Sequence, residues 1–263
     1  MALPPHHNEM KAARPPDKRP PHRRELLHVC GLAAVRALFA RDPGRVARLF
    51  FEPRLAAELA PLCHVLAAAR KPYRAVAAAE LARIAGTVLH GGVVAVARPL
   101  PPLAARPEAI AGWAADGKPL VVLDGIGNPH NLGAIARSAA FFAVPRLLLA
   151  ARREQALPSD ASYRVAAGGL DQVALYRAPL PALLPALRRV YRVIGAAAEG
   201  GVPPARRHDG RPVALVLGNE ERGLDPATRA LCEEIVTIPG GGAVQSLNVA
   251  AAAAILIYLL TCR

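Results

Sequence analysis

The pattern of apolar and polar positions changes near residue 118. Beyond that point, short and nearly continuous apolar runs alternate with longer amphipathic segments, as buried parallel strands alternate with the helices that connect them. Strands are expected over residues 120–123, 146–149, 173–176, 192–196, 213–217 and 235–238. The pattern therefore predicts an α/β domain with about six parallel strands over residues 118–263.

Helices are expected between these strands, over residues 129–142, 162–169, 180–190, 225–232 and 247–260. Pro129 suits the first turn of its helix, and Asn128 directly before it is a favoured N-cap residue. For the last helix we expect Ser246 to be the N-cap, because its hydroxyl can accept a hydrogen bond from a first-turn amide. Three glycines at 240–242 would let the preceding loop bend sharply.

The chain before residue 118 is predicted to contain a second, smaller unit. Residues 25–98 are expected to form a small α/β domain, in which helices cover a mixed sheet. Its helices are expected over 29–40, 55–69 and 78–85, and its strands over 46–51, 73–76 and 93–97. Pro61 should kink or break the second of these helices, because proline removes a backbone hydrogen bond.

Two stretches are expected to lie outside both domains. Residues 1–24 are basic and rich in proline, which predicts a disordered tail. Such a tail either binds phosphate groups loosely or only keeps the protein in solution. Residues 99–117 are a proline-rich linker by composition, with Trp113 in a short helix near its end.

Composition narrows the class of protein. The 263 residues are 53% hydrophobic, enough to bury a core, and they carry a formal net charge of +13 that is spread along the chain. A basic protein of this kind suits a polyanionic partner, most often nucleic acid, although a basic protein without such a partner would look the same. Aromatic residues make up only 4%, which argues against a platform that stacks single-stranded bases.

The cysteines and the apolar segments argue against several other classes. Cys30, Cys63, Cys232 and Cys262 lie far apart and form no Cys-x-x-Cys pair. We therefore expect no metal site, and reduced thiols in a cytoplasmic protein. The N-terminus lacks the apolar segment of a secretory signal, and no apolar run reaches the length of about 20 residues that a membrane span needs.

Three loops follow predicted strands, at the edge where open α/β sheets bind ligands. They are the first loop (residues 124–133), the second loop (218–224) and the third loop (238–249). Gly125 and Gly127 suggest a dinucleotide site, but His130 stands where the third glycine belongs, so a nicotinamide-dependent enzyme is disfavoured. The second loop lacks the Gly-Lys-Ser/Thr sequence of a triphosphate-binding loop.

Taken together, the three loops resemble the signature motifs of the SpoU/TrmH branch of SPOUT RNA methyltransferases. The matching stretches are Asn-Leu-Gly-Ala-Ile-Ala-Arg at 131–137, Leu-Gly-Asn-Glu-Glu-Arg-Gly-Leu at 217–224 and Ile-Pro-Gly-Gly-Gly-Ala-Val-Gln-Ser-Leu-Asn-Val at 238–249. Residues 25–98 resemble, less strongly, the substrate-binding domain of the branch's ribosomal-RNA guanosine methyltransferases. The marks are Gly31-x-x-x-Val35-x-Ala37-Leu38, Pro43-x-Arg45 and His90-Gly91-Gly92-Val93-Val94-Ala95.

The resemblance implies S-adenosylmethionine-dependent methylation of a ribose 2′-hydroxyl in structured RNA, most readily of a guanosine in large-subunit ribosomal RNA. A transfer-RNA 2′-O-methyltransferase and a non-catalytic, RNA-binding ribosome-assembly factor are the alternatives. The resemblance also implies a deep trefoil knot in the C-terminal domain, and a homodimer whose active sites lie at the interface.

The resemblance assigns catalytic roles to Arg137, Asn131, Glu220, Ser246 and Asn248. A guanidinium with a pKa above about 12 is a poor base, so Arg137 should hold an RNA phosphate and orient the hydroxyl, acting as a base only if its site perturbs it strongly. Helical spacing places Arg137 off the apolar stripe of its helix, and Asn131, six residues earlier, on a different face. Glu220 should orient Arg137 or order the loops, while Ser246 and Asn248 should lie beside the ribose.

Six residues match the family's cofactor-contact positions: Leu217, Gly218, Asn219, Ile238, Gly242 and Leu247. Main-chain groups in an apolar slot would then hold the adenine. His130 matches no catalytic position. The chain departs from the family's pattern at Gly240, Ala250 and Gly91, where Met, Ser and Gln are common. The first two departures bear on cofactor packing and the third on RNA recognition.

Overall fold

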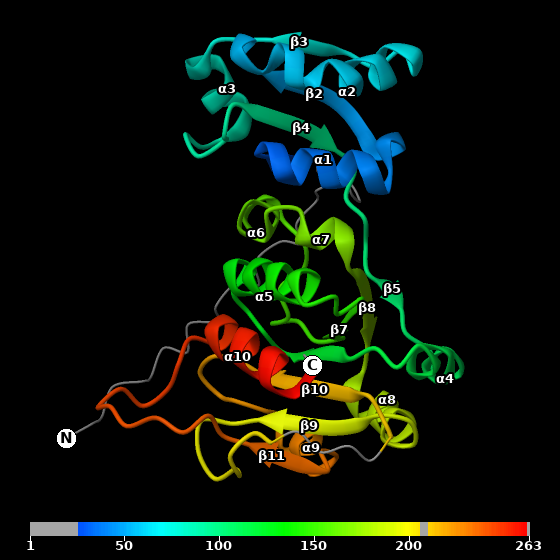
Figure 1. Ribbon diagram of the computed structural model, residues 1–263, viewed down its shortest axis with the longest axis vertical. Coiled ribbons are helices and arrows are strands. Elements are labelled where there is room, and N and C mark those ends of the chain that lie inside the picture. The colour runs from blue at the N-terminus through cyan, green and yellow to red at the C-terminus, as the bar shows by residue number, and fades with distance from the viewer. Residues whose placement is uncertain (1–25, 206–209, 262–263) are drawn as a thin grey trace, which may run out of the picture.

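The computed structural model describes residues 26–205 and 210–261, and these contain two separate β-sheets (Figure 1). The smaller sheet has four strands in the order β1-β4-β2-β3, and the larger has seven in the order β11-β9-β10-β6-β7-β8-β5. The predicted α/β class is confirmed. The tail predicted over residues 1–24 falls outside the described residues, as does Cys262.

The smaller sheet lies within residues 27–97 and packs against helices. Its strands are β1 (Leu27–Cys30), β2 (Val46–Phe51), β3 (Tyr73–Ala75) and β4 (Val93–Ala97), and the helices between them are α1 (Leu32–Arg41), α2 (Ala56–Ala68) and α3 (Ala78–Ala85). Strand β4 runs antiparallel to β1 and β2, whereas β2 and β3 are parallel. The sheet is therefore mixed, as predicted.

The start of the first helix was predicted wrongly. Val29 and Cys30 belong to strand β1, where they pair with β4, and the helix begins only at Leu32. Gly31 makes the turn between them with a φ of 90°, which glycine adopts without steric cost. The apolar run was long enough for a buried strand and a helix in succession, and its periodicity alone did not separate the two.

Helix α2 is not broken at Pro61, so of the kink or break that was expected, the break does not occur. Pro61 is exposed, so the ring lies on the solvent side of the helix. The opposite side buries Leu59, Cys63 and Leu66 in the core. Burial of this face stabilises the helix enough to offset the hydrogen bond that proline cannot make.

The larger sheet is parallel throughout. Six strands lie within two residues of their predicted positions: β6 (Leu120–Asp124), β7 (Arg146–Ala150), β8 (Ala174–Ala178), β9 (Arg192–Ala196), β10 (Val213–Gly218) and β11 (Glu234–Val236). A seventh strand, β5 (Leu103–Ala104), pairs with β8 and is followed by α4 (Pro107–Ala115). Part of the segment expected to be a linker therefore joins the larger sheet, and Trp113 is buried in its core.

Helices cover both faces of the larger sheet (Figure 1). One face packs against α5 (Pro129–Phe141), α7 (Gly169–Gln172) and α10 (Val249–Thr261), and α6 (Asp160–Ala166) packs on α5. The other face packs against α4 and α8 (Leu180–Arg188), with α9 (Pro226–Ala230) in contact with α8. The helix predicted over 162–169 is divided into α6 and α7, because Ala167 and Gly168 both adopt positive φ values.

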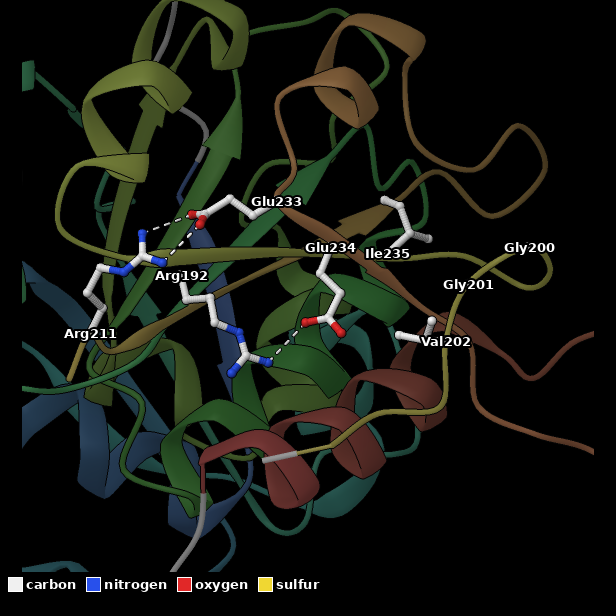
Figure 2. Close-up of a pocket in the computed structure, with 8 residues that line it drawn as sticks. All are labelled: Arg192, Gly200, Gly201, Val202, Arg211, Glu233, Glu234 and Ile235. Carbon is white, nitrogen blue, oxygen red and sulfur yellow. Dashed lines mark hydrogen bonds and ion pairs between the residues drawn. The ribbon is translucent and has the colours of Figure 1, made fainter. Parts of the chain in front are cut away.

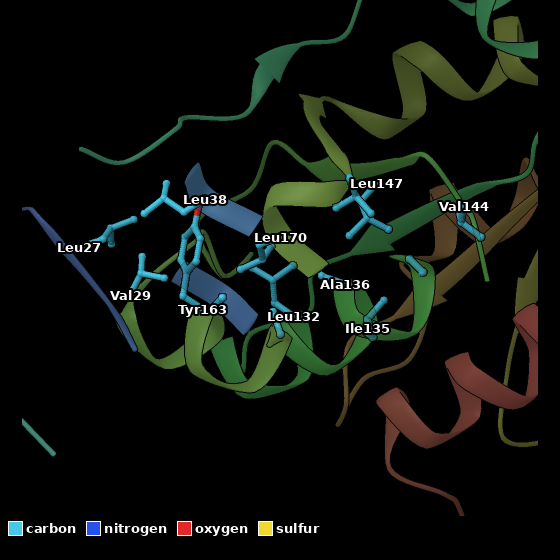
Figure 3. Packing of buried hydrophobic residues seen from close by; sticks show 14 of the residues in the cluster. Leu27, Val29, Leu38, Leu132, Ile135, Ala136, Val144, Leu147, Tyr163 and Leu170 are labelled. Carbon is cyan, nitrogen blue, oxygen red and sulfur yellow. The ribbon is translucent and has the colours of Figure 1, made fainter. Parts of the chain in front are cut away.

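One apolar core extends from the smaller sheet into the larger one. Leu38 of α1 belongs to the same cluster as Tyr163 of α6 and Leu170 of α7, and the three lie close together in Figure 3. The cluster continues to Leu132 of α5 and Leu147 of β7. The helix that carries the first loop's motif is thus packed, through α6 and α7, against the N-terminal part of the chain.

The last helix begins two residues later than predicted and has a different cap. Asn248 precedes α10, and its Oδ1 accepts a hydrogen bond from the backbone N of Ala250 (2.9 Å). Ser246 is therefore not the N-cap. No helix within the described ranges combines the length and the apolar character that crossing a membrane requires.

Candidate active site

The first and second loops lie side by side because the strands before them are neighbours. β10 pairs in parallel with β6, so that Gly218 lies opposite Asp124. Parallel strands end at the same edge of a sheet, and the loops that follow them emerge together. The third loop follows β11 and leads into α10, which contacts α5. The fold thus gathers three loops that are far apart in the sequence.

Glu220 connects the first two loops. Its Oε1 accepts hydrogen bonds from Nδ2 of Asn131 (2.8 Å) and the backbone N of Asn128 (3.3 Å), and its Oε2 accepts one from the backbone N of Gly127 (3.2 Å). Burial raises the pKa of this carboxyl, but the hydrogen bonds from Asn131 and the backbone amides outweigh burial and bring the pKa below its usual value. Glu220 is therefore held as a carboxylate, in a position that orders the loops.

Asn131 carries this connection to the third loop. It lies in the first turn of α5 and is buried. Its Oδ1 accepts a hydrogen bond from Nδ2 of Asn248 (3.1 Å), while its Nδ2 donates to Glu220. The side-chain oxygen of Asn248 caps α10 at the same time. A single row of hydrogen bonds, Glu220–Asn131–Asn248, therefore joins one residue from each loop.

Asn219 fastens the second loop to the first. Its Nδ2 donates to the carbonyl oxygen of Gly125 (2.8 Å), and its Oδ1 accepts from the backbone N of Glu221 (3.0 Å) and of Arg222 (3.1 Å). The second loop closes tightly beside it, because a Cβ at Gly218 would lie 2.3 Å from the carbonyl carbon of Gly223. No side chain other than hydrogen fits there, which explains the glycine.

Arg137 lies on the exposed side of α5, as its spacing predicted. The opposite side of the helix is buried through Leu132, Ile135, Ala136 and Ala139. Within the described part of the chain, its guanidinium makes no hydrogen bond or ion pair, including with Glu220, Ser246 or Asn248. Its five donors are therefore available to a ligand.

A cavity of about 1140 Å³ lies beside the second and third loops. All six predicted cofactor residues line it: Leu217, Gly218, Asn219, Ile238, Gly242 and Leu247. Glu220, Ser246 and Asn248 line it as well, whereas Arg137 and Asn131 do not. Much of the remaining wall is glycine and alanine, including Ala196 to Ala198, so few long side chains line it.

Ser246 stands apart from the network of the other site residues. It is exposed, and its hydroxyl makes no hydrogen bond with any residue that the structure describes. Gly240 to Gly242 leave open space, since a Cβ on any of them would meet nothing within 4 Å. The third loop is therefore held at its end by Asn248, and its polar side chain at Ser246 is available to a ligand.

Comparison with known proteins identifies the family. The model of the SpoU rRNA Methylase family matches residues 118–258, and a model described as RNA 2′-O ribose methyltransferase substrate binding matches residues 28–103. The chain belongs to the SpoU rRNA methylase family. Both resemblances drawn from the loops and from the N-terminal part are thereby confirmed.

Relatives of this SpoU-family chain match it along most of its length. The 23S rRNA (guanosine-2′-O-)-methyltransferase RlmB of Photorhabdus laumondii is 32% identical over 241 residues, which are 88% of this chain and 95% of that protein. The Escherichia coli K12 protein of the same name is 30% identical over 237 residues, 88% of this chain and 96% of that one.

Solved structures share the fold. The SpoU methyltransferase AviRb of Streptomyces viridochromogenes, in complex with the cofactor AdoMet, matches with a TM-score of 0.63 and 25% identity over 89% of this chain and 88% of that one. An rRNA methyltransferase of Sinorhizobium meliloti matches with a TM-score of 0.69 and 21% identity, covering 89% of this chain and 86% of that one.

A fourth segment, which connects β7 to α6, also contacts the loops and was not predicted from the sequence. Arg152 forms ion pairs with Asp124 (3.3 Å) and Asp225 (3.1 Å), at the start of the first loop and just after the second. Gln155 is buried against the first loop. This segment contains no glycine pattern and no residue pair at a recognisable spacing, so nothing in the sequence alone marked it.

A second cavity, of about 700 Å³, lies at the edge of the larger sheet (Figure 2). Its charged side chains form two ion pairs, Arg192 with Glu234 (3.2 Å) and Arg211 with Glu233 (2.9 Å). Because these charges compensate one another, the cavity favours neither an anion nor a cation. Among the described residues, no cluster of three His, Cys, Asp or Glu side chains could hold a metal ion.

Proposed function

We propose that this SpoU-family chain uses S-adenosylmethionine to methylate the 2′-hydroxyl of a guanosine in 23S ribosomal RNA. The assignment of the substrate is supported by one observation. The two RlmB relatives named for that reaction each align with 88% of the chain, including the part that matches the substrate-binding model. A transfer-RNA target and a non-catalytic role are not favoured, because both of these relatives are named for methylation of 23S rRNA.

The cavity beside the second and third loops suits the cofactor. Leu217, Gly218 and Ile238 line it together with the apolar residues Val236 and Leu256, a setting that suits an adenine ring. AviRb, which shares the fold, was solved with AdoMet bound. When bound, S-adenosylmethionine would supply an electrophilic methyl group on a sulfonium centre. We assign its contacts to Leu217, Gly218, Asn219, Ile238, Gly242 and Leu247.

The chain's own residues would position the RNA. Arg137 presents an unoccupied guanidinium, which suits an RNA phosphate and can also orient the ribose hydroxyl by hydrogen bonding. Ser246 offers an exposed hydroxyl in the cavity wall, and Asn248 lines the same wall. Glu220 and Asn131 do not need to touch the ribose in this account, because their hydrogen bonds fix the loops. Close positioning of this kind can supply a large part of a rate enhancement.

A homodimer is also proposed, with the active sites at its interface. Large apolar side chains are exposed on neighbouring surfaces: Phe141 at the end of α5 is 82% exposed and Tyr258 of α10 is 58% exposed. Phe142 connects them, with its ring 5.0 Å from Phe141 and 6.0 Å from Tyr258. Exposed apolar surface of this extent favours a protein partner, and a second copy would also cover the third loop.

We propose that residues 25–98 bind the RNA, that 118–263 form the catalytic domain, and that the third loop and α10 pass through a trefoil knot. The match of the two family models to separate parts of the chain supports the division. Action on ribosomal RNA favours a cytoplasmic location.

Methyl transfer in vitro tests the proposed activity. Purified protein with tritiated S-adenosylmethionine and a 23S rRNA transcript is expected to label the RNA, and an equal mass of transfer RNA is not. The variant Arg137→Ala should lose at least about 100-fold in kcat while its affinity for S-adenosylmethionine changes less than about threefold. Arg189→Ala, at the exposed end of α8, is the matched control and should behave as wild type. Labelling of transfer RNA alone would refute the substrate, and full turnover by Arg137→Ala would refute its role.

A further inference from the structure

The segment between β7 and α6, residues 151–159, packs against the first loop although it belongs to none of the three motifs. A Cβ at Gly127 would lie 3.4 Å from the carbonyl oxygen of Glu154. The backbone N of Ala156 donates to the carbonyl oxygen of Ile126 (2.8 Å). Residues 125–127 of the first loop therefore rest on this segment and do not extend freely into solvent.

Gln155 forms the centre of this contact. Its Oε1 accepts hydrogen bonds from the backbone N of Gly125 (3.0 Å) and of Ile126 (3.2 Å). Its Nε2 donates to the carbonyl oxygens of Ile126 (3.2 Å) and Ala156 (3.2 Å). The residue is 4% exposed, so the whole amide group is used inside the protein. The side-chain amide of Gln155 thus satisfies backbone groups of Gly125 and Ile126 that a neighbouring strand would pair inside a sheet.

The residues that Gln155 holds lead directly to the site. Gly127 and Asn128 follow Ile126, and their backbone N–H groups are the donors that bind the carboxylate of Glu220. Asn128 also caps α5, the helix that carries Asn131 and Arg137. A shift of Ile126 would therefore move the amides that hold Glu220 and the start of the catalytic helix together.

We propose that Gln155 is a positioning residue for methyl transfer, which acts by fixing the first loop beneath Glu220. The expected loss of kcat rests on the proposed function, whereas the expected loosening of the first loop does not. Removing the amide leaves the N–H groups of Gly125 and Ile126 without an acceptor in a buried place, so the loop must move or admit water. Buried side chains that orient catalytic groups commonly matter almost as much as the groups themselves.

Gln155→Met keeps the volume of the side chain and removes its hydrogen bonds. We expect kcat for the 23S rRNA transcript to fall about 10- to 100-fold, with the affinity for S-adenosylmethionine changed less than about threefold. Gln172→Met is the matched control, because the side chain of Gln172 is exposed and makes no hydrogen bond with the described residues. Rates are expressed per cofactor-binding site, so that partial unfolding does not count as lost activity. If Gln155→Met fails to fold, Gln155→Ala, which leaves room for water, replaces it.

A double variant distinguishes an effect of Gln155 that acts through Glu220 from a general loosening of the protein that does not. If Gln155 acts through Glu220, adding Gln155→Met to Glu220→Gln should lower kcat by less than about twofold beyond Glu220→Gln alone. Independent, multiplying losses would contradict the proposal. A kcat for Gln155→Met equal to that of Gln172→Met would also overturn it.

Hydrogen exchange of the backbone amides tests whether Gln155 holds the first loop in place, even if the wild-type protein methylates no RNA. The amides of residues 125–128 should exchange faster in Gln155→Met than in wild type, and those of β9 should not change. An unchanged exchange rate at 125–128 would show that Gln155 does not hold the loop, whatever the substrate of the enzyme is.

Discussion

At the scale of single residues, the site depends on side chains whose hydrogen bonds are shared between loops. Glu220 binds two backbone amides and Asn131, and Asn219 binds the first loop as well as backbone amides of its own loop. Arg137, by contrast, is held only by its helix. The motifs singled out Glu220, Asn131 and Asn248, which the structure joins by hydrogen bonds, while their part in the reaction stays a prediction. The sequence left two roles for Glu220 open, since no spacing rule tells which amides a carboxylate will meet.

The ionisation of Glu220 makes part of the stability dependent on pH. Its pKa lies below the usual 4.5 in the folded protein, so the carboxylate stabilises the fold above that pH, and the contribution is lost as the pH falls through the lowered value. Glu220→Gln cannot be ionised and has no such contribution to lose. The difference in free energy of unfolding between wild type and Glu220→Gln should therefore be largest at neutral pH and shrink below about pH 4.5. Thermal unfolding at pH 7 and at pH 3.5 measures it, and a gap that widens in acid would contradict the assignment.

At the scale of elements, the sequence located most helices and strands but not their junctions. The six predicted parallel strands exist because buried parallel strands are continuously apolar. β5 was missed because two residues carry too little pattern to be distinguished from a linker. The cap of α10 was assigned wrongly because Ser246 and Asn248 are both good cap residues, and only the position of the first helical turn decides between them.

The identity of this cap is directly testable. Asn248→Ala removes the hydrogen bond to the backbone N of Ala250 and the one to Asn131, and should lower the free energy of unfolding by about 0.5–2 kcal/mol. Ser246→Ala should change it by less than about 0.5 kcal/mol, because the hydroxyl is exposed and has no partner in the described chain. Urea unfolding of the two variants compares them. An equal or larger loss in Ser246→Ala would restore Ser246 as the cap.

At the scale of the whole molecule, the N-terminal part is fixed to the larger sheet by a buried polar contact as well as by the shared core. Nη1 of Arg45 lies 2.6 Å from Oδ1 of Asp171 in α7, and Nη2 donates to the hydroxyl of Tyr163 (3.0 Å). His28 of β1 also pairs with Asp160 (3.0 Å). The sequence predicted two domains, but not this contact, because no local pattern relates residues more than 100 positions apart.

Breaking the buried pair should be costly. Asp171→Ala leaves the guanidinium of Arg45 buried without its charged partner, and the free energy of unfolding should fall by about 3–5 kcal/mol. Glu58→Ala removes the partner of Arg36 in an exposed pair and is the control, with an expected loss of about 0–1 kcal/mol. Chemical denaturation measures both variants. Similar losses in the two would mean that the Arg45–Asp171 pair does not hold the parts together.

We propose that this SpoU-family chain methylates one guanosine of 23S ribosomal RNA and that Arg137 is essential for the transfer. Sequencing-based mapping of ribose methylation in total RNA from the source organism tests it most directly, in a strain that lacks the gene and in that strain complemented with wild type or with Arg137→Ala. We predict that a single 2′-O-methylguanosine of 23S rRNA disappears in the deletion, returns with the wild-type chain and does not return with Arg137→Ala. An unchanged 23S rRNA pattern, or a site lost from transfer RNA instead, would contradict the account.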